Sequence, residues 1–139
     1  MLPTEIPIPL SFERFDWHEN RGFYLLLFTL ERSEILSIGR LGKCRFDPGL
    51  YCYVGSAKRN LRQRIRRHCS SDKPMRWHID PLTLIATIRA VVPIPWAGHS
   101  ECEIANSLVR KEWRRYPKGF GASDCRCKGH LLYLDTKES

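Results

Sequence analysis

Apolar residues gather in three short stretches in the first half of the chain, each bounded by residues typical of turns. The stretch 22–30 is aromatic and aliphatic without alternation, which predicts a strand covered on both faces. A polar turn separates it from a second short strand, predicted at 35–38. Glycines and prolines indicate a loop over 39–49, and the apolar stretch 50–54 predicts a third strand. Because these connections are short, we expect the strands to be antiparallel.

The hydrophobic period changes to that of a helix over residues 60–69. The apolar positions that carry this period are Leu61, Ile65 and Cys69. Beyond this helix, the aliphatic and β-branched stretch 82–92 predicts a strand from about residue 84. Asp80 and Pro81 leave a helix start open at the same place, since proline is favoured at the first helical position.

A second amphipathic helix is predicted over 101–115, with Ser100 at its N-cap and Glu103 at the third helical position, which is the pattern of a capping box. Residues 131–134 predict a last short strand. At ~100–200 residues per domain, a chain of 139 residues makes one domain. The expected parts are an irregular arm (1–21), the domain (22–134) and a polar tail (135–139).

The composition of the chain narrows its possible partners. There are 23 Lys and Arg against 15 Asp and Glu, a net charge of +8, which favours a polyanion such as nucleic acid or an anionic membrane surface. A membrane partner is discounted, because no stretch approaches the ~20 apolar residues of a spanning helix. With no leader segment recognised, we expect a soluble cytoplasmic protein whose six cysteines are reduced thiols or metal ligands.

Most of the positive charge lies between residues 58 and 77, which contain eight basic residues and one acid. The side chains predicted on the outer face of the first helix, or just before it, are Lys58, Arg59, Arg62, Arg66 and Arg67. Such a face can be a solvated surface. Eight basic residues in twenty exceed what solubility needs, so we interpret this face as binding the phosphates of nucleic acid.

Two polar residues of the first helix, Arg64 and His68, lie one turn apart beside its apolar stripe and are expected to point toward the sheet. An arginine at a core boundary must find an anion. That anion is either a structural carboxylate or a phosphate that gains charge in a transition state.

Glu101 lies on the apolar face of the second helix, where burial of a carboxylate is unfavourable unless a cation or metal meets it. Glu103 is explained by the capping box. Glu112 also points inward, but at about 1.5 Å per residue it lies ~16 Å further along, too far to share a site with Glu101. Glu101 is therefore the candidate metal ligand.

The order of these residues resembles that of the GIY-YIG nucleases. The motif positions are Gly22-Phe-Tyr24, Tyr53-Val-Gly55, Arg64, His68 and Glu101. The spacing from Tyr53 to His68 carries most of the match. The segments Arg64-Ile-Arg-Arg-His68, Trp77-His-Ile-Asp80 and 120–131 resemble in particular the small Uri branch, and the resemblance spans roughly residues 22–134.

The resemblance implies an α/β (α+β) fold with a small three-stranded antiparallel sheet flanked by helices. Because 28 residues lie between Tyr24 and Tyr53, more than is usual in the family, an additional strand or hairpin is expected around 35–38. The implied activity is a divalent-metal-dependent endonuclease that hydrolyses phosphodiester bonds of nucleic acid, with DNA rather than RNA as the expected substrate.

The resemblance also implies a role for each candidate catalytic residue. Tyr53 is expected to activate the attacking water, Tyr24 to position the water or the phosphate, and Arg64 to stabilise charge on the phosphate. His68 contacts the phosphate or assists proton transfer, and Glu101 holds Mg²⁺ or Mn²⁺. A tyrosine with a pKa near 10 is a poor base unless a cation, Arg64 or the metal, lowers that pKa.

Alternatives accompany several of these assignments. Cys125, Cys127 and His130 have a spacing suitable for zinc, but a structural zinc site needs four ligands; the competing interpretation is a loop over the cleft. His78 and Asp80 line that cleft, or are a surface residue and a helix cap. The asparagine common in the superfamily has no clear counterpart; Ser123 or Asp124 can replace it.

The competing function is a non-catalytic module that binds nucleic acid through the basic helix 58–69, with Tyr24 and Tyr53 as packing aromatics. The sequence leaves open whether DNA or RNA is bound, in which strandedness and with what sequence preference, because the helix carries no base-reading signature. It also leaves open the oligomeric state and the pathway.

Overall fold

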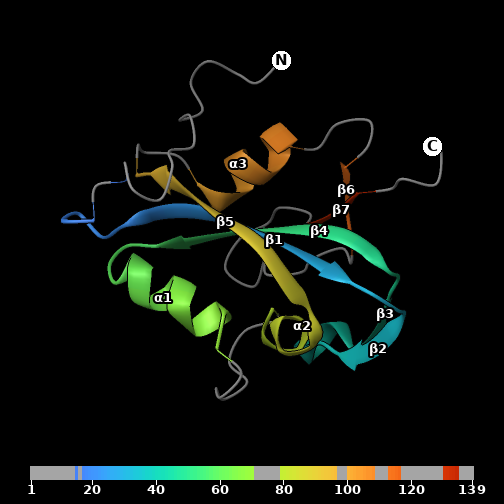
Figure 1. Cartoon of the computed structure of the whole chain (residues 1–139). Helices are drawn as coiled ribbons and strands as arrows, with labels where there is room; N and C mark the ends of the chain where they lie inside the picture. Colours follow the sequence, from blue (N-terminus) through green and yellow to red (C-terminus); the bar gives the residue numbers. More distant parts are fainter. Residues whose placement is uncertain are drawn as a thin grey trace.

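The computed structural model describes residues 15, 17–70, 79–96, 100–108, 113–116 and 130–134. Most of the predicted arm and the whole predicted tail lie outside these residues. The described chain has an α+β fold, in which an antiparallel sheet carries helices on both faces and a small hairpin lies to one side (Figure 1). No helix within these ranges is long and apolar enough to pass through a bilayer.

Five strands of the described chain form the main sheet, in the order β5, β1, β4, β7, β6. Their bounds are β1 Gly22–Leu30, β4 Gly49–Ala57, β5 Thr87–Pro95, β6 Trp113–Arg115 and β7 Leu131–Leu134. Each neighbouring pair is antiparallel, as expected. The prediction of three strands is wrong, because β5 extends the sheet beyond β1 and β6 extends it beyond β7.

The additional hairpin expected near 35–38 is a separate two-stranded sheet. β2 (Glu34–Ser37) pairs with β3 (Lys43–Phe46) across the short 3-10 helix η1 (Gly39–Leu41). The prediction of a continuous loop over 39–49 is wrong at β3. Buried and exposed side chains alternate along β3, as in a strand with one covered face.

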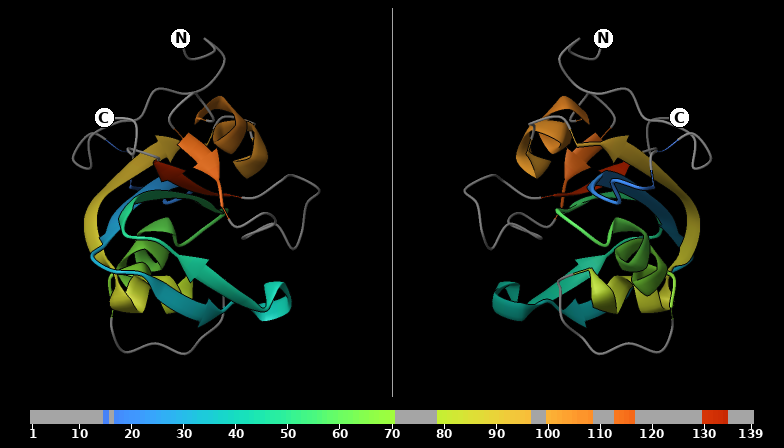
Figure 2. Two further views of the ribbon diagram at one scale, coloured as in Figure 1. Left: turned by 90° about the vertical axis from the view of Figure 1, so that its right-hand side faces the viewer. Right: turned by 90° about the vertical axis from the view of Figure 1, so that its left-hand side faces the viewer.

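Three helices flank the sheet in the described residues: α1 (Leu61–His68), α2 (Asp80–Ile85) and α3 (Glu101–Leu108). Helices α1 and α2 lie on one face of the sheet and α3 lies on the other (Figures 1 and 2). At the start of α3, Ser100 N donates to Glu103 Oε1 at 2.8 Å and Glu103 N donates to Ser100 Oγ at 3.2 Å. The capping box is confirmed.

Two element boundaries differ from their predictions. The alternative of a helix start at Asp80 and Pro81 is confirmed, since α2 begins there. The following strand, β5, begins at Thr87 rather than near residue 84. The predicted helix 101–115 is a helix only as far as Leu108 in the described chain, since Trp113–Arg115 is a strand paired with β7. Backbone pairing at this sheet edge prevails over local helical periodicity.

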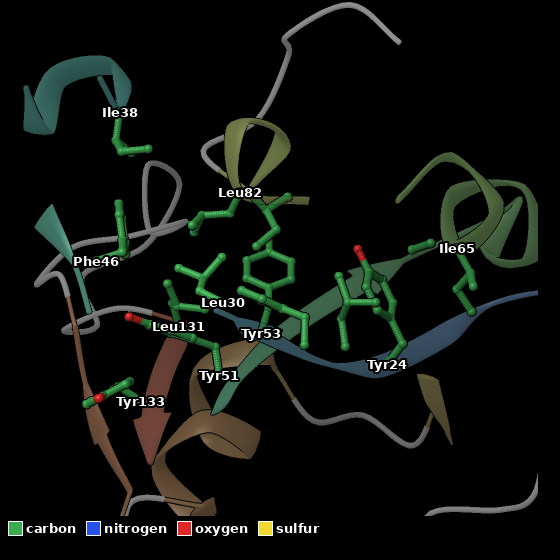
Figure 3. Close-up of a cluster of buried hydrophobic side chains, with 14 of the residues drawn as sticks. Tyr24, Leu30, Ile38, Phe46, Tyr51, Tyr53, Ile65, Leu82, Leu131 and Tyr133 are labelled. Carbon is green, nitrogen blue, oxygen red and sulfur yellow. The ribbon is translucent and has the colours of Figure 1, made fainter. Parts of the chain in front are cut away.

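The two faces of the sheet bury different clusters. On the side of α1 and α2, Tyr24 and Tyr53 pack in a large cluster with Ile65 and Leu82 (Figure 3). The smaller cluster, on the side of α3, contains Phe23, Val54, Ile94, Ile104 and Ala105. Successive strand residues point to opposite faces, so the Phe23-Tyr24 and Tyr53-Val54 steps send both tyrosines toward α1.

The start of α1 is fixed by Asn20, which lies two residues before β1. Its carbonyl oxygen accepts a hydrogen bond from Leu61 N at 3.0 Å, and its Oδ1 accepts one from Arg62 N at 2.9 Å. Asn60, the residue before the helix, has a φ of 58°. Asn20 thus satisfies two amide groups that a helix N-terminus leaves without intrahelical partners, and holds α1 beside the end of β4.

Candidate active site at the end of strand β4

Tyr24, Tyr53 and His68 form a compact group under α1. Tyr24 Oη and His68 Nε2 are hydrogen-bonded at 2.6 Å in the buried interior. The two tyrosine rings have centroids 6.4 Å apart, and the Tyr53 ring lies 6.1 Å from the imidazole. Both phenols come from neighbouring strands and lie in the cluster that also contains Ile65 and Leu82 (Figure 3). The structure therefore brings three of the five predicted catalytic residues into contact.

Gly55 makes room for the Tyr24 ring. The two residues are opposite each other in the β1–β4 pair, and a Cβ added at Gly55 would overlap the outer edge of the ring, at its Cζ and hydroxyl. Glycine is needed at position 55 because the Tyr24 ring, from β1, lies against the backbone of β4 at this residue. The glycine of the Tyr53-Val-Gly55 motif is thus explained by the packing of Tyr24.

Arg64 and Glu101 approach Ser56 from opposite faces of the sheet. Arg64, on α1, donates a hydrogen bond from a terminal guanidinium nitrogen to the Ser56 carbonyl oxygen at 2.6 Å. Ser56 Oγ donates a hydrogen bond to Glu101 Oε2 on α3. The β4–β7 pairing covers only 50–53 on β4, so Ser56 lies past the end of β7. At this strand end, residues from the two faces of the sheet meet.

Glu101 has a second partner in His130, which directly precedes β7. His130 Nδ1 lies 2.9 Å from Glu101 Oε1, and its Nε2 lies 3.4 Å from Cys102 Sγ. The sequence predicts His130 as a zinc ligand or as part of a loop over the cleft, and it assigns no role to Ser56. Alternation along β4 could have placed Ser56 on the α3 face, two residues after Val54, but no sequence pattern brings residue 130 to the start of α3.

Arg67 does not belong to the outer basic face, and its predicted position is corrected. Its guanidinium makes a two-pronged ion pair with Asp80 on α2, at 2.8 and 2.9 Å. Asp80 is fully buried and the Arg67 side chain is 18% exposed. Its side chain therefore crosses to α2, where the pairing satisfies a carboxylate removed from water. The pair links the two helices.

The remaining predicted phosphate-binding residues stay near the surface. Lys58, Arg59 and Arg66 are exposed. Arg62 is half-buried, with its guanidinium carbon 4.7 Å from the centroid of the Trp17 ring. Lys58 and Arg59, just before α1, and Arg66 on α1 thus form an exposed basic face, with Arg62 packed against an aromatic beside it.

Comparison with known proteins places the chain in a family. The family model described as "Domain of unknown function DUF123" matches residues 23–139, which includes every candidate site residue. The chain belongs to the DUF123 family. A search of the curated proteins and a search of the solved structures each gave no match.

Burial controls the protonation of both phenols of the DUF123 domain. It raises the pKa of Tyr24 well above the ordinary value of 10.0; Tyr53 raises it further, whereas Arg64 lowers it. Burial likewise raises the pKa of Tyr53, with Glu101 adding to the rise and Arg64 opposing it. The expectation that Arg64 lowers the tyrosine pKa is right in sign, but burial outweighs it. Both phenols are protonated at neutral pH.

These raised pKa values predict that the domain loses stability in alkali. The pKa of each phenol is higher in the folded protein than in the unfolded chain, so the unfolded chain loses these protons first as the pH rises. The contribution of the two phenols to the free energy of unfolding is therefore complete below about pH 10 and is lost as the pH rises above it. Urea unfolding between about pH 8 and about pH 11 measures the effect. We expect the free energy of unfolding to fall less steeply with pH in Tyr24→Phe than in the unchanged chain. Tyr116→Phe, at a tyrosine outside this site, is the control and should behave as the unchanged chain does. Equal declines in all three would contradict a raised pKa at Tyr24.

Glu101 suits a hard divalent cation. Mg²⁺ is commonly held through one or two carboxylates with several waters, and the side chain of Glu101 is 27% exposed at the edge of the site, where water has access. No group of three or more His, Cys, Asp or Glu side chains with metal-binding geometry occurs in the described part of the chain. A cation at Glu101 would therefore depend on water and substrate oxygens for its remaining ligands.

Several residues considered above lie outside the described part of the chain: two basic residues of the segment 58–77 (Lys73 and Arg76), His78, Glu112, Ser123, Asp124, Cys125 and Cys127. The zinc prediction stays a prediction. Asp80 is the first residue of α2, after Ile79 at the N-cap position, and its carboxylate pairs with Arg67. The prediction of Asp80 as the cap residue is therefore off by one position.

Proposed function

We propose that the chain is a divalent-metal-dependent endonuclease that hydrolyses phosphodiester bonds of nucleic acid, with DNA as the expected substrate. The observation that supports this is the meeting of Arg64 and Glu101 on Ser56, next to the buried Tyr24–His68 pair. A guanidinium, a carboxylate, an imidazole and phenols are the groups that phosphoryl transfer uses to position the phosphate and stabilise its charge. The resemblance to GIY-YIG nucleases of the Uri type supports the same reaction.

Each residue has a distinct task in this proposal. Arg64 stabilises the negative charge that develops on the phosphate oxygens, and its bond to the Ser56 carbonyl preorganises it at the strand end. Tyr53 orients the attacking water. Tyr24, rather than Tyr53, can then accept a proton from this water as it passes its own hydroxyl proton to His68 Nε2, so no phenolate has to form in advance. The tasks that the resemblance implies for the two tyrosines are thereby exchanged. Glu101 would hold Mg²⁺ or Mn²⁺, which supplies Lewis-acid stabilisation when bound.

The exposed basic face holds the nucleic-acid backbone in this proposal. Each phosphate contact with duplex DNA contributes about 0.9 to the slope of log affinity against log salt. For the double variant Arg59→Gln/Arg66→Gln, we therefore expect a slope smaller by up to about 2, measured by fluorescence anisotropy across a salt series. Arg32→Gln, at an arginine whose side chain is 87% exposed elsewhere, is the matched control. An unchanged slope in the double variant would reject the basic-face assignment.

A binding module without catalysis is the second candidate. The observation that favours it is the burial that keeps both phenols protonated at neutral pH, where neither is a base. Such a module keeps the salt-dependent binding of the basic face and has no need of Glu101. It therefore predicts the same affinity with and without a divalent cation, and intact substrate after long incubation.

The proposal is tested by incubating the chain with labelled DNA and RNA as single strands, duplexes and branched structures. Each is assayed with Mg²⁺, with Mn²⁺ and with a chelator. We expect internal cleavage of at least one DNA structure with either cation and none with the chelator. Binding without cleavage in every condition would support the binding module instead.

A further inference from the structure

His130 contacts the candidate metal ligand from the buried side. Its side chain is 3% exposed, whereas that of Glu101 is 27% exposed, and the two approach to 2.9 Å between Nδ1 and Oε1. The other carboxylate oxygen, Oε2, accepts the hydrogen bond from Ser56 Oγ. The carboxylate is thus held between the imidazole and the strand end, while part of the side chain reaches solvent.

The imidazole is itself anchored on both sides. The carbonyl oxygen of His130 accepts a hydrogen bond from Val54 N at 2.9 Å, on the same strand that presents Ser56 two residues later. Its Nε2 lies 3.4 Å from Cys102 Sγ on α3. The ring cannot turn without losing contacts to α3, and its backbone cannot shift without losing the bond to β4. The position of His130 is therefore tied to both elements that build the strand end.

We propose that His130 is a positioning residue that fixes the carboxylate of Glu101 in the orientation that binds the divalent cation. This inference rests on the proposed function, because it takes Glu101 as the ligand. A glutamate side chain has several rotatable bonds, and ordering it in advance reduces the entropy lost when the cation binds. Removing a residue that orients a metal ligand typically lowers metal affinity by ~10–100-fold.

Two amide substitutions separate the contact with Glu101 from the contact with Cys102. The side-chain nitrogen of asparagine can take the place of Nδ1, whereas that of the longer glutamine can take the place of Nε2. The full chain, without nucleic acid, is titrated with Mn²⁺ alone, and free Mn²⁺ is followed by electron paramagnetic resonance. We expect affinity within about threefold of the unchanged chain for His130→Asn, and at least about tenfold weaker for His130→Gln and His130→Ala.

Thermal unfolding of each variant shows whether the fold is kept, and Cys69→Ala, at an exposed cysteine outside the site, is the control, expected to bind Mn²⁺ as the unchanged chain does. If His130→Ala does not fold, the Asn and Gln variants alone decide, because their side chains are similar in volume. Equal Mn²⁺ affinity in His130→Asn, His130→Gln and the unchanged chain would overturn this inference alone. If Glu101→Gln binds Mn²⁺ as tightly as the unchanged chain does, or if neither binds it, the assignment of Glu101 as the metal ligand is overturned as well.

Discussion

Glu101→Gln is expected to remove metal-dependent cleavage while leaving nucleic-acid binding nearly intact. The substitution keeps the size of the side chain and its contact with Ser56, but it removes the charge that a divalent cation needs. Loss of a Lewis acid at a phosphoryl transfer removes several kcal/mol of transition-state stabilisation, so the single-turnover rate should fall by at least ~100-fold. Gel-based cleavage under enzyme excess measures this rate, and anisotropy in chelator measures the binding.

Glu103→Gln is the matched control, because Glu103 is the other carboxylate in the first turn of α3. It accepts a hydrogen bond from Ser100 N, and glutamine can serve at this position of a capping box. We expect its cleavage rate to stay within about threefold of the unchanged chain, far from the loss at Glu101. Equal losses at both positions would indicate a general effect of charge or helix stability rather than a metal ligand.

The largest loss of stability is expected for Asp80→Ala. Asp80 is fully buried, and both of its oxygens pair with the Arg67 guanidinium. Removing one member of a buried pair leaves an uncompensated charge, which typically destabilises a protein by ~3–5 kcal/mol. Urea unfolding followed by circular dichroism at neutral pH measures the free energy of unfolding of the variant and of the unchanged chain.

The double variant Arg67→Met/Asp80→Leu distinguishes the ion pair from simple packing. Replacing both members of a buried pair with apolar residues is often neutral, because no charge remains out of water. We therefore expect the double variant to be more stable than Asp80→Ala. A double variant that is as unstable as the single one would show that α2 needs the shape of these residues rather than their pairing.

The local patterns of the sequence predicted the elements that carry most of the site. The helical period from Leu61 to Ile65 places Arg64 and His68 toward the sheet. The capping box fixes the start of α3. These features depend on neighbouring residues, so the sequence alone carries them.

Contacts between distant segments explain what sequence reasoning missed. Arg67 occupies an outer position on a helical wheel, yet it turns to Asp80, which a wheel drawn for one helix cannot show. His130 reaches Glu101 only because β7 pairs with β4. β3 was missed because the glycines and proline around it indicated a loop, although its own alternation was present.

The central claim is that Arg64 and Glu101, on helices that cover opposite faces of the sheet, act on one phosphodiester at the end of β4. A double-mutant cycle with the mild substitutions Arg64→Lys and Glu101→Asp tests this claim most directly, using single-turnover cleavage rates with Mn²⁺. Residues that act as a unit are strongly non-additive, so the account predicts that the double variant is only slightly slower than the slower single variant. Losses that multiply would show two independent sites and would contradict the account.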